Sequence, residues 1–217
     1  SVPSSLRKEV ETCGLCHARR GQFAEGWVPG RPLSDTHLIA ALSQGLYQPD
    51  GQMLDEVYNY GSFKQSKMYA AGVTCSDCHD PHSVKLKLAG DKVCLQCHAE
   101  AYASPTHTHH EGVTPAVGCV SCHMPERTFM VVDKRHDHSF RVPRPDLSDK
   151  LQTNNACTDC HKDKPASWAA AAIEGGIIVR TGMIDARSGG TSAIIIEKTI
   201  KPSPRSAGFF SRRAKSR

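Results

Sequence analysis

Residues 75–98 read CSDCHDPHSVKLKLAGDKVCLQCH, so a Cys-x-x-Cys-His motif stands at each end of one short stretch. The motif recurs at residues 13–17, 119–123 and 157–161, and its five copies use every cysteine of the chain. This spacing is the attachment signature of c-type haem. Two thiols one helical turn apart bind the two vinyl groups of one porphyrin, and the adjacent histidine ligates the iron.

Two other chemistries use paired cysteines, namely zinc knuckles and redox disulfides. Neither of them explains a histidine directly after the second cysteine in all five copies. We therefore predict five haem c groups. The predicted attachment cysteines are Cys13, Cys16, Cys75, Cys78, Cys94, Cys97, Cys119, Cys122, Cys157 and Cys160. The predicted proximal iron ligands are His17, His79, His98, His123 and His161.

The spacing of the motifs also predicts the fold class. All five lie within residues 13–161, which leaves about 30 residues for each haem, too few to give each porphyrin its own apolar core. Aromatic residues are only 6% of the chain and the mean hydropathy is −0.42. We therefore expect a multihaem cytochrome c fold, in which loops and short α-helices surround a core of stacked haems.

Hydrophobic periodicity and capping residues predict a few local elements. We expect an amphipathic helix over residues 35–47, a weaker one over 53–71 that is interrupted at Gly61, and a helix over 168–173. Residues 80–93 and 124–150 are rich in proline, aspartate, histidine and charge, which predicts loops.

The chain changes character after residue 174. Residues 176–200 contain no cysteine, histidine or aromatic residue, and GIIVRTGMI and TSAIIIEKTI predict a β-hairpin. We expect three parts: a pentahaem domain over 1–174, a hairpin extension over 175–200 and a basic tail over 201–217. The hairpin either packs on the haem domain or extends the sheet edge of a neighbouring molecule.

The net charge of +5 comes from the tail. Six of the 27 basic residues lie in 201–217 and no acidic residue does, so residues 1–200 hold 21 basic against 22 acidic side chains. Haem propionates add further negative charge, so this charge does not predict a nucleic-acid partner. No run of 18 apolar residues predicts a membrane span. Haem c is attached outside the cytoplasm, which predicts a periplasmic or extracellular protein.

The second axial ligand of each iron must come from elsewhere in the chain or from a partner. Seven histidines lie outside the motifs, and five are needed if every iron has two histidine ligands. His82 lies three residues after His79, and a span of at most about 10 Å cannot reach the opposite face of the same porphyrin. We expect His82 to serve another haem, of which the one at Cys94 and Cys97 is nearest in sequence. His107 or His110 could reach back to that haem or across to another.

Several phrases resemble a known family: GCVSCHMPERTFMVVD, DHSFRVPRPDLS and NACTDCHKDKPASWAA. Together with the doubled motif of residues 75–98, they resemble the bacterial multihaem c-type cytochromes of the cytochrome c-552/c-554 group, often found beside tetratricopeptide repeats. The resemblance covers about residues 9–173 and implies multihaem electron transfer. The distal ligands that it implies are His37, His82, His107, His110 and His138, with His109 and His136 as spares.

Some cytochromes similar to these polymerise into extracellular wires, in which a histidine of one subunit ligates a haem of the next. The resemblance therefore implies two kinds of partner, namely redox proteins and further copies of this chain. Such relatives often carry more haem sites upstream, whereas here the first cysteine is residue 13.

Three classes of function remain after these observations. An electron carrier needs two strong ligands on every iron, and the supply of histidines allows this. A haem enzyme of the nitrite-reducing or hydroxylamine-oxidising kind needs an open iron, often marked by a lysine in place of the motif histidine, and no motif here has that lysine. A subunit that acts only within a larger redox complex is the third. We expect an electron carrier without catalytic residues.

Overall fold

The computed structural model describes residues 8–113 and 117–174, and the segments in this range are short helices, loops and small β-hairpins. The α-helices are α1 Lys8–His17, α2 Tyr58–Lys64, α3 Lys67–Ala70, α4 Cys75–Cys78, α5 Pro105–Thr108, α6 Cys119–His123, α7 Pro145–Leu151, α8 Ala156–Cys160 and α9 Ala166–Glu174. The 3-10 helices are η1 Leu33–Asp35, η2 Gly90–Val93 and η3 Glu100–Ala103.

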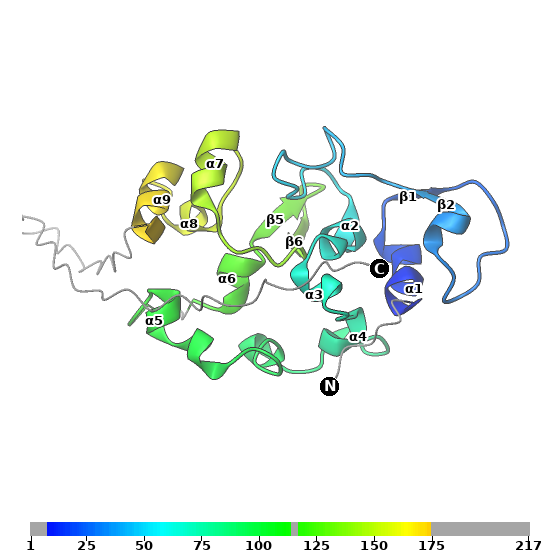
Figure 1. Ribbon diagram of the computed structural model, residues 1–217, viewed down its shortest axis with the longest axis horizontal. Helices are drawn as coiled ribbons and strands as arrows, with labels where there is room; N and C mark the ends of the chain where they lie inside the picture. The colour runs from blue at the N-terminus through cyan, green and yellow to red at the C-terminus, as the bar shows by residue number, and fades with distance from the viewer. Residues whose placement is uncertain (1–7, 114–116, 175–217) are drawn as a thin grey trace, which may run out of the picture. The chain divides into compact units, whose positions relative to one another are not determined.

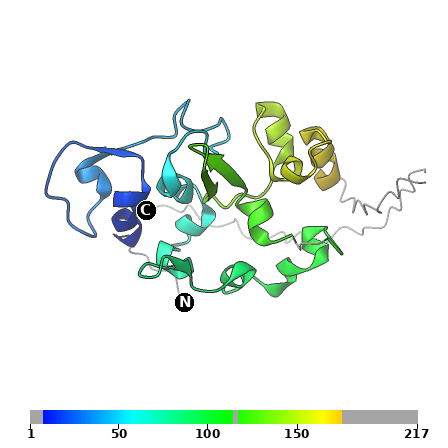
Figure 2. The same cartoon turned by 180° about the vertical axis from the view of Figure 1, so that it is seen from behind.

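Within the described residues, six strands form three antiparallel pairs. Their bounds are β1 Arg20–Gln22, β2 His37–Ile39, β3 His79–Asp80, β4 Lys85–Leu86, β5 Glu126–Phe129 and β6 Asp133–His136. Strand β1 pairs with β2, β3 with β4, and β5 with β6, in the last case with Glu126 opposite His136 and Phe129 opposite Asp133. In Figures 1 and 2 the β5–β6 hairpin lies between α2 and α7, while α7, α8 and α9 form one group.

The attachment motifs coincide with helical turns. The first, second, fourth and fifth lie on α1, α4, α6 and α8, and the third follows η2 as a turn in which the His98 amide donates to the Cys94 carbonyl. Because residues i and i+3 of a helical turn lie on one face, each turn presents its two cysteines together. The local fold therefore suits attachment of one porphyrin per motif.

In the part of the chain that the structure describes, the buried apolar side chains form two small clusters. One contains Val10, Leu33, Tyr60 and Phe63, and the other contains Tyr47, Met53, Val57 and Phe129. Gly14 lies inside the first motif, and a Cβ there would stand 2.6 Å from the Tyr60 ring, so this close approach of α1 to α2 requires glycine. The small clusters agree with a chain that has too little apolar protein to form a core by itself.

The helix predicted over 35–47 is wrong. This segment instead contains the end of η1, then strand β2, and then loops with two isolated β-bridges. Strand β2 pairs with β1, a contact between distant residues that helical periodicity does not report. The helix predicted over 53–71 is present as α2 and α3, but the break lies at Ser66, whose hydroxyl accepts from the Tyr69 amide and so starts α3.

The prediction of loops over 124–150 is also wrong, because this range contains β5, β6 and α7. The charged side chains of residues 126–129 hide the alternation of polar and apolar residues that would predict a strand. These residues form a strand through their pairing with β6. Residues 80–93 contain β4 and η2 as well as loops. The helix predicted over 168–173 is confirmed as part of α9. The predicted hairpin and basic tail, residues 175–217, lie outside the described residues.

The turn between β5 and β6 places a branched side chain in an unfavourable backbone conformation. Val131 has φ +71° and is 92% exposed. We expect Val131→Gly to raise the free energy of unfolding by about 1 kcal/mol, because β-branched residues are disfavoured at positive φ and this side chain loses no packing. Denaturant unfolding measures the change. Val132→Gly is the control: Val132 is also exposed but lacks a positive φ, so this variant should lose stability.

Haem attachment sites as the candidate functional site

Several histidines are held by hydrogen bonds from the ring nitrogen Nδ1. His123 donates to the Arg141 carbonyl at 2.7 Å, His110 to the Thr108 carbonyl at 2.5 Å and His138 to the His136 carbonyl at 2.9 Å. A carbonyl oxygen only accepts, so Nδ1 carries the proton and Nε2 keeps its lone pair. Histidines that ligate a metal through Nε2 commonly donate from Nδ1 to a backbone carbonyl in this way, which fixes the ring orientation.

Three motif histidines face a histidine from another segment. The ring centroids are 6.3 Å apart for His79 and His138, 6.1 Å for His123 and His107, and 6.1 Å for His161 and His110. The ring planes of these pairs differ by 26°, 7° and 33°. Each pair therefore consists of two imidazoles with similar orientation and a gap between them.

The size of this gap fits one iron ion. A metal–imidazole nitrogen bond is about 2 Å long, so two imidazoles on opposite sides of one metal have ring centroids roughly 6 Å apart. The three observed separations match this value. Burial also lowers the pKa of His138, which keeps its imidazole in the neutral form that binds metals. The residues at these three motifs therefore fit a haem iron with two histidine ligands.

The other two motifs have a different geometry. In residues 8–113 and 117–174, no second histidine ring faces His17 or His98 with a centroid separation near 6 Å. The rings of His98 and Tyr102 meet edge-on, with centroids 6.3 Å apart. His37 is buried, and its Nδ1 lies 2.8 Å from the Thr36 hydroxyl. His82 is exposed. The structure thus brings His107, His110 and His138 opposite motif histidines but does not bring His37 or His82 there.

The two predicted spares differ from each other. His109 is exposed and ends α5 with φ +56°, which turns the chain between His107 and His110. His136 is half-buried and donates from Nδ1 to the Met124 carbonyl at 2.8 Å. Its carbonyl in turn accepts from His138, so His136 helps to orient the ring that faces His79.

Contacts between cysteines give the spatial order of the motifs. The sulfurs of Cys13 and Cys75 lie within 4.8 Å of each other, and the thiols of Cys94 and Cys119 interact with each other. Cys78 interacts electrostatically with Cys94, and Cys122 with Cys157. Consecutive motifs are therefore neighbours in space. The first and second motifs, and likewise the third and fourth, interact through the first cysteine of each motif. The second and third motifs, and likewise the fourth and fifth, interact through the second cysteine of the earlier motif and the first cysteine of the later one.

Two of the motif cysteines, Cys75 and Cys119, are poor nucleophiles in this structure. Burial raises the pKa of Cys75 to about 12 and that of Cys119 to about 11, and nearby acidic groups and thiols add to the effect. Both thiols are therefore protonated at neutral pH. A Glu9 carboxylate oxygen and the sulfurs of Cys13 and Cys75 lie within 4.8 Å of one another, the spacing of a three-ligand metal site. The motifs predict instead that both sulfurs attach porphyrins.

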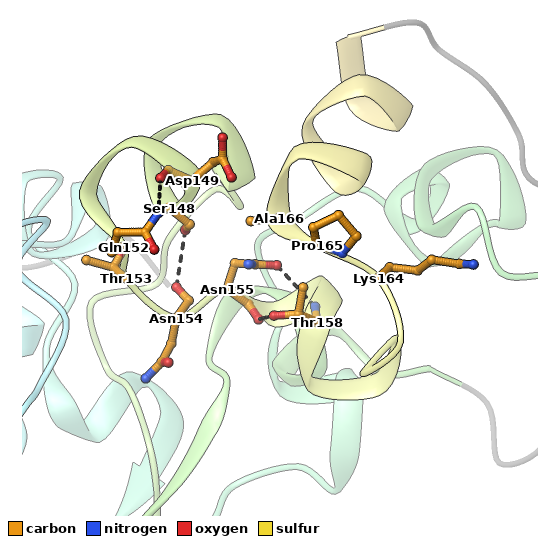
Figure 3. Close-up of a pocket in the computed structure, with 10 residues that line it drawn as sticks. All are labelled: Ser148, Asp149, Gln152, Thr153, Asn154, Asn155, Thr158, Lys164, Pro165 and Ala166. Carbon is orange, nitrogen blue, oxygen red and sulfur yellow. Dashed lines mark hydrogen bonds between the residues drawn. The ribbon is translucent and has the colours of Figure 1, made fainter.

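The fifth motif is supported by its own set of contacts. Arg127 of β5 pairs with Asp159, between the two cysteines of this motif, at 2.6 Å. The Asn155 side chain accepts from the amides of Cys157 and Thr158 and so starts α8. Asn155 and Ser148 line a polar cavity of about 390 Å³. Figure 3 shows both side chains between α7 and the α8–α9 turn, where the Ser148 hydroxyl donates to the Asn154 carbonyl. The side chains of Ser148 and Asn155 thus bond to the backbone on either side of the start of α8 and help to fix the segment that carries the motif.

The chain contains two features shared with known proteins. Residues 67–103 match the family model of the doubled CXXCH motif. The crystal structure of the outer cell wall cytochrome OcwA is similar, with a TM-score of 0.58 and 19% sequence identity over 76% of this chain and 51% of that one. The chain thus spans about half the length of that cytochrome. No curated protein sequence matches this chain significantly.

Both comparisons agree with the motifs. The doubled motif that matches the family model contains the second and third attachment sites, and the shared fold is that of a cytochrome. Across residues 8–113 and 117–174, no helix is long and apolar enough to cross a bilayer. The motifs, the family model and the fold together identify the chain as a multihaem c-type cytochrome with doubled CXXCH motifs.

Proposed function

We propose that this protein carries electrons through five covalently bound haems, each with two histidine ligands. Haem iron supplies one-electron chemistry by alternating between the ferric and ferrous states. The observation that supports this proposal best is the three histidine pairs whose centroids lie 6.1 to 6.3 Å apart. An iron with two imidazole ligands has no open position for a substrate, so the same observation disfavours catalysis at these three irons.

Each histidine has a defined role in this proposal. His79, His123 and His161 are proximal ligands, and His138, His107 and His110, in that order, lie on the distal sides of the same irons. For the iron of His98 we propose His82, because that haem is nearest to it in sequence. For the iron of His17 we propose His37, the remaining predicted distal ligand. Backbone carbonyls of Arg141, Thr108 and His136 orient three of these rings by accepting from Nδ1.

The order of the motifs supports a conduit. Contacts link the first motif to the second, the second to the third, and so on to the fifth. Haems attached at successive motifs would be neighbours, and electrons would pass between them in sequence order. We propose residues 1–174 as the pentahaem domain, with 175–200 as a hairpin extension and 201–217 as a basic tail.

The proposed partners are redox proteins and further copies of this chain. The first and fifth motifs lie at the two ends of the proposed series of haems. Electrons would therefore enter and leave at these two haems, or copies of the chain would join there into a wire. We propose a periplasmic or extracellular location, because haem c is attached outside the cytoplasm. The similar OcwA is an outer cell wall cytochrome, which agrees with this location.

Intact-mass spectrometry and a redox titration test the proposal. We expect a mass that corresponds to five covalent haems, and reversible reduction at potentials below those of cytochromes with methionine and histidine ligands, because a thioether ligand raises the potential. A mass with fewer haems after maturation in a haem c-assembling host would contradict the five-haem proposal. Catalytic turnover of nitrite or hydroxylamine would contradict the proposal that the protein is an electron carrier.

A further inference from the structure

Glu9 links the first attachment motif to the second. It lies on α1, four residues before Cys13, and its side chain leaves this helix to contact the start of α4. Its carboxylate accepts hydrogen bonds from the Ser76 amide at 2.6 Å and the Ser76 hydroxyl at 2.7 Å, and from the Thr74 hydroxyl at 3.2 Å. One carboxylate thus joins the helices that carry two successive motifs.

Asp91 makes an equivalent link between the third and fourth motifs. It lies on η2, three residues before Cys94, and its Oδ1 accepts from the Cys119 amide at 3.0 Å at the start of α6. A Cβ on Gly118 would stand 3.1 Å from this oxygen, so glycine allows the carboxylate to come this close. The two junctions therefore share one design: an acid just before one motif binds the first turn of the next.

Both carboxylates lie between the attachment points of two porphyrins. An oxygen of Glu9 lies within 4.8 Å of the sulfurs of both Cys13 and Cys75, and Asp91 interacts electrostatically with both Cys94 and Cys119. Both acids are half-buried, which weakens screening by solvent and salt. The fifth motif differs, because its helix α8 starts with the neutral amide of Asn155 from its own segment.

We propose that Glu9 and Asp91 are positioning residues, each of which fixes the packing of two successive haems and places one negative charge between them. This inference rests on the proposed attachment of haem at the first four motifs. A negative charge near two irons favours the ferric state of both. Each acid should therefore lower the reduction potentials of two haems together, while its hydrogen bonds hold the two motifs at one separation and orientation.

Charge and position can be separated with two substitutions at each site. Glu9→Gln and Asp91→Asn remove the charge and keep the shape, and Glu9→Ala and Asp91→Ala also remove the hydrogen bonds. A spectroelectrochemical titration reports the potentials. Circular dichroism in the Soret band reports exciton coupling between neighbouring haems, which depends on their distance and orientation. Glu25→Gln is the control, because it removes an exposed carboxylate.

We expect each amide variant to lower the oxidised-to-reduced ratio of two haems about tenfold at a fixed potential, which corresponds to ~59 mV for a one-electron couple. The paired positive and negative bands that exciton coupling produces in the Soret circular dichroism spectrum (the Soret couplet) should persist in the amide variants. They should lose amplitude in the alanine variants. The Glu25→Gln control should change neither signal.

Two outcomes would contradict the inference. One is an unchanged couplet and unchanged potentials in all four variants, each loaded with as many haems as the wild type. The other is a shift confined to one haem in each amide variant. The haem count of the wild type, measured first, separates these outcomes from failure of the proposed function: missing haems in the wild type overturn both proposals. If an alanine variant does not mature, the amide variant of the same residue still tests the shared charge.

Discussion

Replacing His138 by alanine is expected to convert one ferric iron of the oxidised protein from low-spin to high-spin. His138 faces His79 with ring centroids 6.3 Å apart, and in the proposed arrangement it is the distal ligand at the second motif. Without this imidazole the iron keeps one strong ligand, and its reduction potential should rise. Electron paramagnetic resonance with spin quantification measures the change, and a titration gives the potential.

Two further variants make this prediction specific. His107→Ala should affect a different iron in the same way, because His107 faces His123. His109→Asn is the matched control, since His109 is exposed and asparagine tolerates its φ of +56°. His138→Met should restore a six-coordinate iron with a raised potential, because a thioether replaces an imidazole. A low-spin His138→Ala protein with an unchanged potential would exclude His138 as a ligand.

The double substitution Cys94→Ser and Cys97→Ser is expected to remove one haem and to interrupt the conduit. In the proposed order the third haem connects the second with the fourth, and Cys94 interacts electrostatically with Cys78 and with Cys119. Because electron tunnelling falls exponentially with distance, electron equilibration between the haems on the two sides should slow by orders of magnitude. Intact mass shows the lost haem, and pulsed photoreduction measures the rate.

The matched control for this variant removes a haem at the end of the order. Cys157→Ser with Cys160→Ser should also lose one haem but leave exchange among the other four fast, because α8 carries the last motif. Equal rates in the two variants would contradict the sequence order of the conduit. Loss of the protein in both variants would mean that each haem is required for folding, in which case exchange is measured in the wild type at partial reduction.

The attachment motifs were predictable from the sequence because their chemistry is local. Cysteine spacing and an adjacent histidine define haem c attachment without knowledge of the fold, and the doubled-motif match agrees with it over residues 67–103. The small core was predictable for a similar reason, since composition and motif spacing limit the apolar protein available. The fold is indeed composed of short helices, loops and small hairpins.

The pairing of histidines was not predictable from the sequence. His107 and His110 were left with a choice between the haem at Cys94 and a more distant one, and in the structure they face His123 and His161. This choice depends on the path of the whole segment from η3 to α6, including the turn at His109 with its positive φ. His37 was assigned to a helix because its pairing partner, Gln22, is distant in sequence.

The acids between motifs also escaped prediction. Glu9 and Asp91 stand four and three residues before a motif cysteine, and a carboxylate at such a position is unremarkable in a chain with 22 acidic residues. Their role appears only when α4 and α6 are placed beside them. The signal in the sequence was the acidic residue that stands three or four positions before the first cysteine of both the first and the third motif.

The central claim, that every iron has two histidine ligands and none is open, is tested most directly by spin-quantified electron paramagnetic resonance of the oxidised, fully loaded protein. We predict five low-spin ferric irons per chain and no high-spin component. The irons of His17 and His98 decide the result, because no second histidine ring faces either of them in residues 8–113 and 117–174. A high-spin signal of one iron per chain, persisting at high protein concentration, would contradict the claim and indicate an open haem.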